Sequence, residues 1–282
     1  MILFKKTSDL SDYLALQRAA ELKIGFVPTM GALHKGHLAL VNHSKKNTNI
    51  TIASIFVNPT QFNDPQDFAK YPVTLESDLL QLEQAGCDLV FLPAVNEIYP
   101  EGLTISKTYD LGYLETILEG KYRPGHFQGV CQVVDKLLDI VAPTLLFLGQ
   151  KDYQQCMVIR KLIELKGIST TLSIVPTIRE TSGLALSSRN LRLSEKGKEA
   201  AVGIYQSLIY LKQNRQKYPA KQLIEEVEKK LLLAGFTKTD YVAIANANTL
   251  DPVMEWDGDT PLVALIAAFM DGVRLIDNMQ LT

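Results

Sequence analysis

One short segment constrains the fold of this chain more than any other. Residues 24–27 (Ile-Gly-Phe-Val) have the length and composition of a buried strand, and residues 28–37 (Pro-Thr-Met-Gly-Ala-Leu-His-Lys-Gly-His) follow them directly. Apolar residues then recur with helical spacing from residue 38 to about residue 46. A strand, a glycine-containing turn and a helix in this order are typical of an α/β fold in which backbone N–H groups and the positive helix end face a phosphate.

Further strands and helices alternate through the first 176 residues. The apolar runs predict strands at residues 24–27, 50–57, 87–92, 145–148 and 171–175. Helical spacing predicts helices at residues 8–22, 38–46, 75–85, 129–141 and 153–166. Ser8 or Asp9 is expected to cap the first helix. This alternation predicts a doubly wound, Rossmann-like parallel sheet. We expect the ligand site beyond the carboxyl ends of its strands, where the polar segments 58–62, 149–152 and 179 onward lie.

The pattern changes after about residue 176. Ser194 is placed to cap a long helix at residues 195–217, and a second helix is expected at residues 220–234. Two β-rich runs follow at residues 241–245 and 262–268. We therefore expect residues 1–176 to form a Rossmann-like domain and residues 177–282 to form a smaller C-terminal α+β domain hinged to it as a lid.

Composition and charge narrow the class of protein. The formal net charge of −2 offers no general attraction to nucleic acid or to an anionic membrane surface. The first six residues hold too short an apolar run for a signal peptide, and no run approaches the ~20 apolar residues that span a bilayer. Cys87, Cys131 and Cys156 lie far apart in apolar segments, which favours buried thiols in a reducing compartment. We expect a cytoplasmic protein with no nucleic-acid or membrane partner.

His34 and His37 are the first candidates for chemistry. A zinc pair or solvated histidines on a helix face are the competing interpretations. Zinc-binding histidines on a helix favour i, i+4 spacing with a third ligand, whereas these lie three apart and only His43 and His126 remain elsewhere. Phosphate chemistry fits better, with imidazolium donors stabilising the charge that develops as pyrophosphate leaves. Gly36 in a helix would cost about 1 kcal/mol, so we expect close approach of its backbone to a ligand.

Two later segments carry further candidates. Residues 149–152 (Gly-Gln-Lys-Asp) lie between an expected strand and helix, and Lys151 there is disfavoured by the helix dipole unless a phosphate is its partner. Asp152 is placed to cap that helix. Residues 187–189 (Ser-Ser-Arg) lack a Gly-x-Ser-x-Gly nucleophile pattern. Two hydroxyls and a guanidinium suit phosphate binding, and a plain turn remains the alternative.

Neutral amides and a basic loop complete the candidates. Gln61, Gln154 and Gln155 are expected near the same rim of the sheet, although in isolation each would be read as a surface glutamine. Residues 121–127 (Lys-Tyr-Arg-Pro-Gly-His-Phe) form a Gly/Pro loop with two cations. This loop is a candidate lid or interface.

Together these segments resemble the pantothenate synthetase family, the pantoate–β-alanine ligases. The matching blocks are residues 27–37, 54–62, 123–127, 149–155 and 183–190, and residues 271–278 also resemble the end of the family's chains. A His-x-Gly-His alone is shared by many nucleotidyltransferases and class I aminoacyl-tRNA synthetases, whereas the ordered blocks are specific. Gln150 stands where many members carry Glu. This difference affects a peripheral charge and leaves the match at Lys151 unchanged. Ala32 also varies among members.

The resemblance implies a two-domain, homodimeric, Mg²⁺-dependent enzyme of pantothenate and coenzyme A biosynthesis. Such an enzyme joins (R)-pantoate to β-alanine and converts ATP to AMP and pyrophosphate through a pantoyl-adenylate. The resemblance implies that Mg²⁺ is bound mainly through ATP and not by dedicated protein ligands. Two alternatives stay open: a nucleotidyltransferase that keeps the nucleotide on its product, and a non-catalytic nucleotide sensor.

The resemblance also implies site residues. Those implied for ATP binding are Met30, Gly31, Ala32, Leu33, His34, Lys35, Gly36, His37, Gly149, Gln150, Lys151, Asp152, Ile178, Leu186, Ser187, Ser188 and Arg189. Those expected to act in catalysis are His34, His37, Lys151, Ser187, Ser188 and Arg189, with His37 as the proton donor. Gln61 and Gln155 are implied for pantoate, and Gln61 also for β-alanine.

Overall fold

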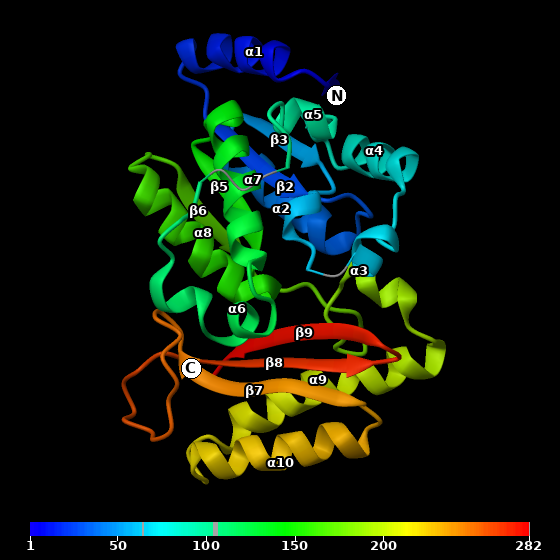
Figure 1. The fold of residues 1–282 in the computed structure, drawn as a ribbon, viewed down its shortest axis with the longest axis vertical. Coiled ribbons are helices and arrows are strands. Elements are labelled where there is room, and N and C mark those ends of the chain that lie inside the picture. Colours follow the sequence, from blue (N-terminus) through cyan, green and yellow to red (C-terminus); the bar gives the residue numbers. More distant parts are fainter. Residues whose placement is uncertain (64, 104–106, 282) are drawn as a thin grey trace. The chain divides into compact units, whose positions relative to one another are not determined.

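The structure is a computed structural model, and it describes residues 1–63, 65–103 and 107–281. The chain divides into two compact units (Figure 1). The first unit comprises Met1–Gly149 and Gln154–Pro176, and the second comprises Gln150–Tyr153 and Thr177–Thr282.

A six-stranded parallel sheet forms the centre of the first unit. Its strands are β1 (Ile2–Phe4), β2 (Ile24–Thr29), β3 (Ile50–Ile55), β4 (Leu89–Phe91), β5 (Leu145–Gly149) and β6 (Thr171–Val175). They lie in the order β1-β4-β3-β2-β5-β6, which confirms the predicted doubly wound fold. The sequence did not predict β1, because three apolar residues are too few to show a period. The strand order reverses between β2 and β5, so ligand binding is favoured at their carboxyl ends.

Helices connect these strands. They are α1 (Thr7–Ala19), α2 (Lys35–Asn47), α3 (Pro65–Ala69), α4 (Leu75–Gln84), α5 (Val95–Ile98), α6 (Leu118–Tyr122), α7 (His126–Val141) and α8 (Tyr153–Lys166), with short 3-10 turns at η1 (Pro59–Gln61), η2 (Gly112–Glu115) and η3 (Gln150–Asp152). The five predicted helices are present. The short helices α3, α5 and α6 were not predicted, because one turn carries little periodicity.

The start of α1 differs from its prediction. Its N-cap is Lys6, which makes no side-chain cap bond, so the expectation that Ser8 or Asp9 caps it was wrong. Glu97 replaces the local cap, because its carboxylate accepts the N–H of Thr7 at 2.8 Å. A residue ninety positions away in the sequence thus satisfies the first turn.

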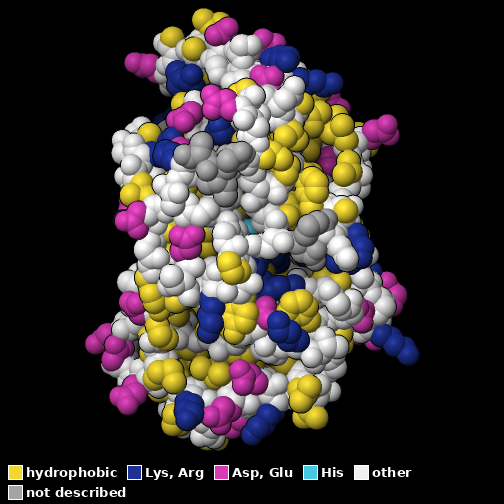
Figure 2. Space-filling view, viewed as in Figure 1, with side chains coloured by type: hydrophobic (Ala, Val, Ile, Leu, Met, Phe, Trp, Pro, Cys, Tyr) yellow, Lys and Arg dark blue, Asp and Glu magenta, His cyan; other side chains and the backbone are white. Residues whose placement is uncertain are grey.

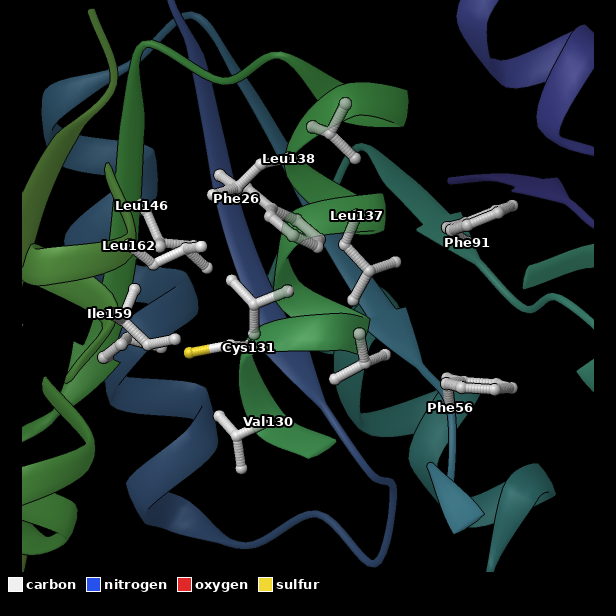
Figure 3. Packing of buried hydrophobic residues seen from close by; sticks show 14 of the residues in the cluster. Phe26, Phe56, Phe91, Val130, Cys131, Leu137, Leu138, Leu146, Ile159 and Leu162 are labelled. Carbon is white, nitrogen blue, oxygen red and sulfur yellow. The ribbon is translucent and has the colours of Figure 1, made fainter. Parts of the chain in front are cut away.

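Alternate residues of the strands face opposite sides of the sheet. On one side Phe26 and Leu146 pack with residues of α1, α7 and α8, including Leu138 and Ile159 (Figure 3). On the other side the cluster consists of Val27, Leu33, Leu40, Val41, Ala53, Ile55, Leu82, Cys87, Val90, Phe147 and Val175, from the sheet, the β2–α2 turn, α2, α4 and the α4–β4 loop. Helices therefore cover both faces.

All three cysteines are buried thiols outside any disulfide, as predicted. Burial raises the pKa of the Cys131 thiol to about 12 and that of Cys87 to about 11. Thiols with such pKa values carry almost no thiolate near neutral pH, so these two are inert core residues.

The second unit is built on a three-stranded antiparallel sheet of β7 (Lys238–Asn246), β8 (Leu262–Met270) and β9 (Val273–Gln280). The helices α9 (Glu195–Asn214) and α10 (Ala220–Leu233) lie on one face of it (Figure 1). Ser194 caps α9 as predicted, because its hydroxyl accepts the N–H of Gly197 at 2.9 Å. The sequence did not predict β9, although Asp271-Gly272, both with positive φ, form the tight turn that joins it to β8.

The surface agrees with the low net charge. Figure 2 shows lysine and arginine side chains interspersed with aspartate and glutamate over the face in view. Within the described ranges, no helix combines the length and the apolar composition that crossing a membrane requires.

Substitution of Leu138 tests whether α7 belongs to the core of the first unit. Leu138 on α7 is 2% exposed, and we expect Leu138→Ala to lower the free energy of unfolding by about 2–5 kcal/mol, because the sheet and helices cannot close the cavity. Urea denaturation measures this difference. Leu16→Ala is the matched control, since Leu16 on α1 is 70% exposed. Equal losses in both variants would contradict the assignment of α7 to the core.

Candidate functional site

The histidine corner, residues 29–37, follows β2 and starts α2. His34 is the N-cap of α2, and its Nδ1 accepts the N–H of Gly36 at 3.1 Å. His37 reaches back, and its Nδ1 accepts the N–H of His34 at 3.3 Å. This is a capping box made of two histidines, a motif that usually pairs Ser or Thr with Glu or Gln. The two rings lie together, with centroids 4.1 Å apart.

These bonds determine the state of the imidazoles. A ring nitrogen that accepts a hydrogen bond carries no proton, so the proton of each ring is on Nε2. The imidazolium donors that we expected do not fit, because an Nδ1–H would point at a backbone N–H. His34 and His37 are instead neutral rings whose Nε2–H groups are donors. Gly36 lies in the first turn of α2, so the expected penalty for a glycine inside a helix does not apply.

Five backbone N–H groups of the corner have acceptors within the protein. The N–H of Gly31 donates to Thr29 Oγ1, and those of Ala32 and Leu33 donate to the carboxylate of Asp78. With the two histidine-bound amides, the N–H groups of residues 31, 32, 33, 34 and 36 all have protein acceptors. These five amides therefore already have acceptors within the protein, which makes the side chains of the corner the candidates for its chemistry.

Asp78 is the residue that this arrangement requires and that the sequence did not single out. It lies on α4, is 1% exposed, and accepts the N–H of Ala32 at 2.9 Å and that of Leu33 at 2.8 Å. Gly31 and Ala32 both have positive φ, a conformation that Ala adopts only at some cost. The buried carboxylate therefore holds a strained turn just before His34. An acid in the first turn of a helix suggests only a dipole interaction from sequence, so no local signal indicates this role.

We expect Asp78→Ala to lower the free energy of unfolding by about 2–4 kcal/mol, since two buried N–H groups lose their acceptor. Urea denaturation measures the loss. Glu76→Ala is the control, because Glu76 is an exposed acid in the same first turn, and its change should stay within about 0.5 kcal/mol. Similar values for both variants would mean that Asp78 acts through the helix dipole alone.

Gln61 lies at the end of η1, after β3. Asn58 is buried and donates from Nδ2 to Gln61 Oε1 at 3.1 Å and to the carbonyl oxygen of Gly129 at 3.2 Å. The Gln61 amide Nε2 lies 3.1 Å from Met30 Sδ, so the structure brings Gln61 to the histidine corner. Gln61 is therefore held in place and is not simply a surface glutamine. No separate role was predicted for Asn58 within residues 54–62, yet Asn58 orients the Gln61 amide.

The two glutamines at the start of α8 differ. Gln154 is 2% exposed; its Oε1 accepts the N–H of Glu119, and its Nε2 donates to the carbonyls of Leu114 and Ile117. The expectation of a surface glutamine was wrong for Gln154, which has a structural role. Gln155 is partly exposed.

Residues 123–127, part of the expected lid or interface loop, lead from α6 into α7, and Pro124 and Gly125 are exposed. Glu119 and Gly120 of α6 are buried, and His126, the first residue of α7, is buried too. The segment is therefore continuous with the core helix α7.

In the second unit, β9 holds the segment with Lys151. Asn278 donates from Nδ2 to the carbonyl oxygens of Gln150 and Lys151, at 2.9 and 2.8 Å. Its Oδ1 accepts from Gln150 Nε2 at 3.3 Å. A Glu at position 150 would place an acceptor against this oxygen, so Gln150 suits its surroundings. The Lys151 ammonium lies 3.9 Å from Asp152 Oδ1.

Asp277, which precedes Asn278 in β9, holds the segment with the two serines through Arg179. Arg179 donates from Nη1 and Nη2 of its guanidinium to the buried carboxylate of Asp277. Burial raises the pKa of Asp277, and the guanidinium acts against this shift. Arg179 also pairs with Ala185 across a short hairpin that leads to Ser187.

The hairpin ends in the 3-10 turn η4 (Ser188–Arg192). Ser187 is its N-cap, with Oγ accepting the N–H of Arg189 at 3.3 Å, and Asn190 donates to the carbonyl of Ala185 at 2.9 Å. The carbonyl of Ile178 accepts the N–H of Leu186, so the implied residues 178 and 186–189 lie in one hydrogen-bonded segment. The sequence missed the anchors Asp277 and Asn278, because their partners lie about one hundred residues or more away.

Within the described residues, no group of three or more His, Cys, Asp or Glu side chains is arranged to hold a metal ion. The carboxylate of Asp78, at the histidine corner, is committed to backbone amides.

Comparison with known proteins gives consistent results. A family model described as pantoate-beta-alanine ligase matches residues 2–280. The chain is 42% identical to the pantothenate synthetase of Cytophaga hutchinsonii and 41% identical to that of Porphyromonas gingivalis, each over 99% of both chains. Among solved structures, a pantothenate synthetase of Thermus thermophilus superposes with a TM-score of 0.90 at 38% identity, covering 100% of this chain and 99% of that one. The pantoate-beta-alanine ligase of Francisella tularensis, complexed with beta-gamma ATP and beta-alanine, gives 0.79 at 37% identity, covering 100% and 98%.

Proposed function

The chain belongs to the pantoate–β-alanine ligase family, and we propose from this that it condenses (R)-pantoate with β-alanine to pantothenate, converting ATP to AMP and pyrophosphate. The observation that carries the proposal is the pair of neutral histidines at the end of β2. The related ligase of Francisella tularensis was solved as a complex with beta-gamma ATP and beta-alanine. The reaction passes through a pantoyl-adenylate, which we assign to this chain on the family's chemistry.

In the first step the carboxylate of pantoate attacks the α-phosphorus of ATP and the bond to pyrophosphate breaks. Negative charge then grows on the α-phosphoryl oxygens and on the leaving group. The Nε2–H groups of His34 and His37 are suited to donate to that charge without a change of protonation. Lys151, Ser187, Ser188 and Arg189 supply the ammonium, hydroxyl and guanidinium donors that phosphates bind. We assign all six residues to stabilising this step; as a neutral ring, His37 does so by donating a hydrogen bond from Nε2–H and not by transferring a proton.

Gln61 and Gln155 are assigned to pantoate, and Gln61 also to β-alanine. Because Asn58 occupies Gln61 Oε1, the amide presents its Nε2 donors. A neutral donor orients a carboxylate or a hydroxyl while leaving the attacking oxygen more nucleophilic than an ion pair with arginine would.

In the second step the amine of β-alanine attacks the carbonyl carbon of the mixed anhydride, and AMP leaves with the electrons of the C–O bond. The anhydride must be kept from water meanwhile. We propose that residues 177–282 act as a lid for this purpose, with a domain boundary near residue 176.

Mg²⁺ is proposed to enter on the phosphates of ATP, where it neutralises charge on the leaving pyrophosphate. The three buried cysteines, none of them in a disulfide, are consistent with a cytoplasmic protein. A homodimer is proposed on family membership alone.

Release of AMP tests the function. The purified chain is incubated with ATP and Mg²⁺, and pantoate and β-alanine are each supplied or withheld. Multiple-turnover AMP release should require both acids. A stable adenylylated product would favour a nucleotidyltransferase instead, and ATP binding with no turnover would favour a sensor.

Substitution of Lys151 tests the first step, the formation of pantoyl-adenylate. We expect Lys151→Ala to slow single-turnover formation of pantoyl-adenylate by roughly 10²–10³-fold while changing pantoate binding little, because its charge acts on the phosphates. The backbone of residue 151 should stay in place, since Asn278 holds its carbonyl. Lys161→Ala is the control, as Lys161 is a partly exposed lysine of α8 paired with Glu164. An unchanged rate in Lys151→Ala would refute the role.

A further inference from the structure

The first turn of α7 contains a histidine with both ring nitrogens bonded. His126 is 5% exposed. Its Nδ1 lies 2.8 Å from the backbone carbonyl oxygen of Gln61, and its Nε2 lies 2.9 Å from Nη1 of Arg123. Neither Arg123 nor His126 has a part in the reaction as proposed above.

The chemistry of the partners assigns the proton. A guanidinium can only donate, so Nε2 of His126 accepts from Arg123. The proton of the neutral ring is therefore on Nδ1, which donates to the Gln61 carbonyl. Glu119 lies one turn before Arg123, with its carboxylate 3.6 Å from Nη1, and keeps the guanidinium beside the ring. The tautomer is the opposite of the one at His34 and His37.

The same helix also holds the side chain of Gln61. The backbone of α7 approaches η1 so closely that a Cβ on Gly129 would lie 2.2 Å from the carbonyl oxygen of Thr60. Asn58 binds both the Gly129 carbonyl and Gln61 Oε1. The start of α7 thus holds Gln61 twice, by its main chain through His126 and by its side chain through Asn58. The remaining polar group of Gln61 is the Nε2 end of its side-chain amide, which lies next to Met30.

We propose that His126, oriented by Arg123, is a positioning residue for the acid substrate: it holds the Gln61 backbone so that the Gln61 amide meets pantoate. This inference rests on the proposed function, because it takes Gln61 to bind pantoate. It predicts a selective effect on that substrate. A buried histidine that only stabilised the fold would affect all substrates alike.

The test compares three substitutions in the full chain. His126→Leu removes both ring bonds, His126→Asn keeps a donor at about the position of Nδ1, and Arg123→Met removes the donor to Nε2. Steady-state kcat and KM are measured for pantoate and for ATP at saturating β-alanine. We expect His126→Leu to raise the KM for pantoate roughly tenfold, a typical cost of a buried hydrogen bond, with the KM for ATP within about twofold. His126→Asn should restore most of the loss, and Arg123→Met should raise the KM for pantoate by about threefold.

Gln128 provides the matched control. It is a buried amide in the same turn of α7, but its hydrogen bonds go to Tyr109 and Glu115 and not to Gln61. Gln128→Leu should lower the midpoint of urea unfolding about as much as His126→Leu, yet leave the KM for pantoate within about twofold. An equal rise in both variants would overturn the inference, because it would trace the effect to a general loosening of α7.

A double-mutant cycle tests whether His126 acts through Gln61. In a Gln61→Ala background, His126→Leu should add less than about twofold to the KM for pantoate, since the amide that it positions is gone. Full additivity would overturn the inference. If His126→Leu does not fold, an unchanged KM for pantoate in Arg123→Met would overturn the inference. Failure of the proposed function would look different, because the wild-type chain would then release no AMP that depends on pantoate.

Discussion

Parallel pairing of the strands of the first unit is the constraint on which the other features depend. Every strand of a parallel sheet ends at the same edge, and each return connection must cross a face of the sheet. Residues far apart in the sequence therefore follow neighbouring strands. The histidine corner follows β2 and the turn with Gln61 follows β3, so Met30 and Gln61 touch although thirty-one positions separate them.

A second regularity concerns how the candidate residues are held. In each unit, a buried polar side chain binds the backbone of a segment that carries candidate residues. Asp78 holds the turn before His34, His126 holds the backbone of Gln61, and Asn278 holds that of Lys151. Backbone amides and carbonyls are satisfied in this way. The side chains of these segments are thereby positioned on a rigid backbone, which is the arrangement that catalysis by positioned donors needs.

The histidines show how strongly hydrogen-bond partners determine chemistry. His34, His37 and His126 are the same residue type in one unit, yet two carry the proton on Nε2 and one on Nδ1. The difference comes from the partner: a backbone N–H faces Nδ1 in the first two, and a guanidinium faces Nε2 in the third. The sequence shows only that histidines are present, and so it favoured imidazolium at the corner.

The sequence by itself determined the parallel sheet, the main helices and the family. Hydrophobic period and turn residues act over a few positions, and the ordered blocks with His34, His37, Lys151 and Ser187 are specific. Short elements such as β1 left no readable period, and in β9 the Asp271-Gly272 turn was the missed signal. Only the tertiary structure decided what holds each candidate residue. The anchors Asp78, Asn278 and Asp277 lie forty-five to one hundred and twenty-eight positions from the segments that they hold. Such a bond forms because folding brings two segments together, so neither segment alone carries a sign of it.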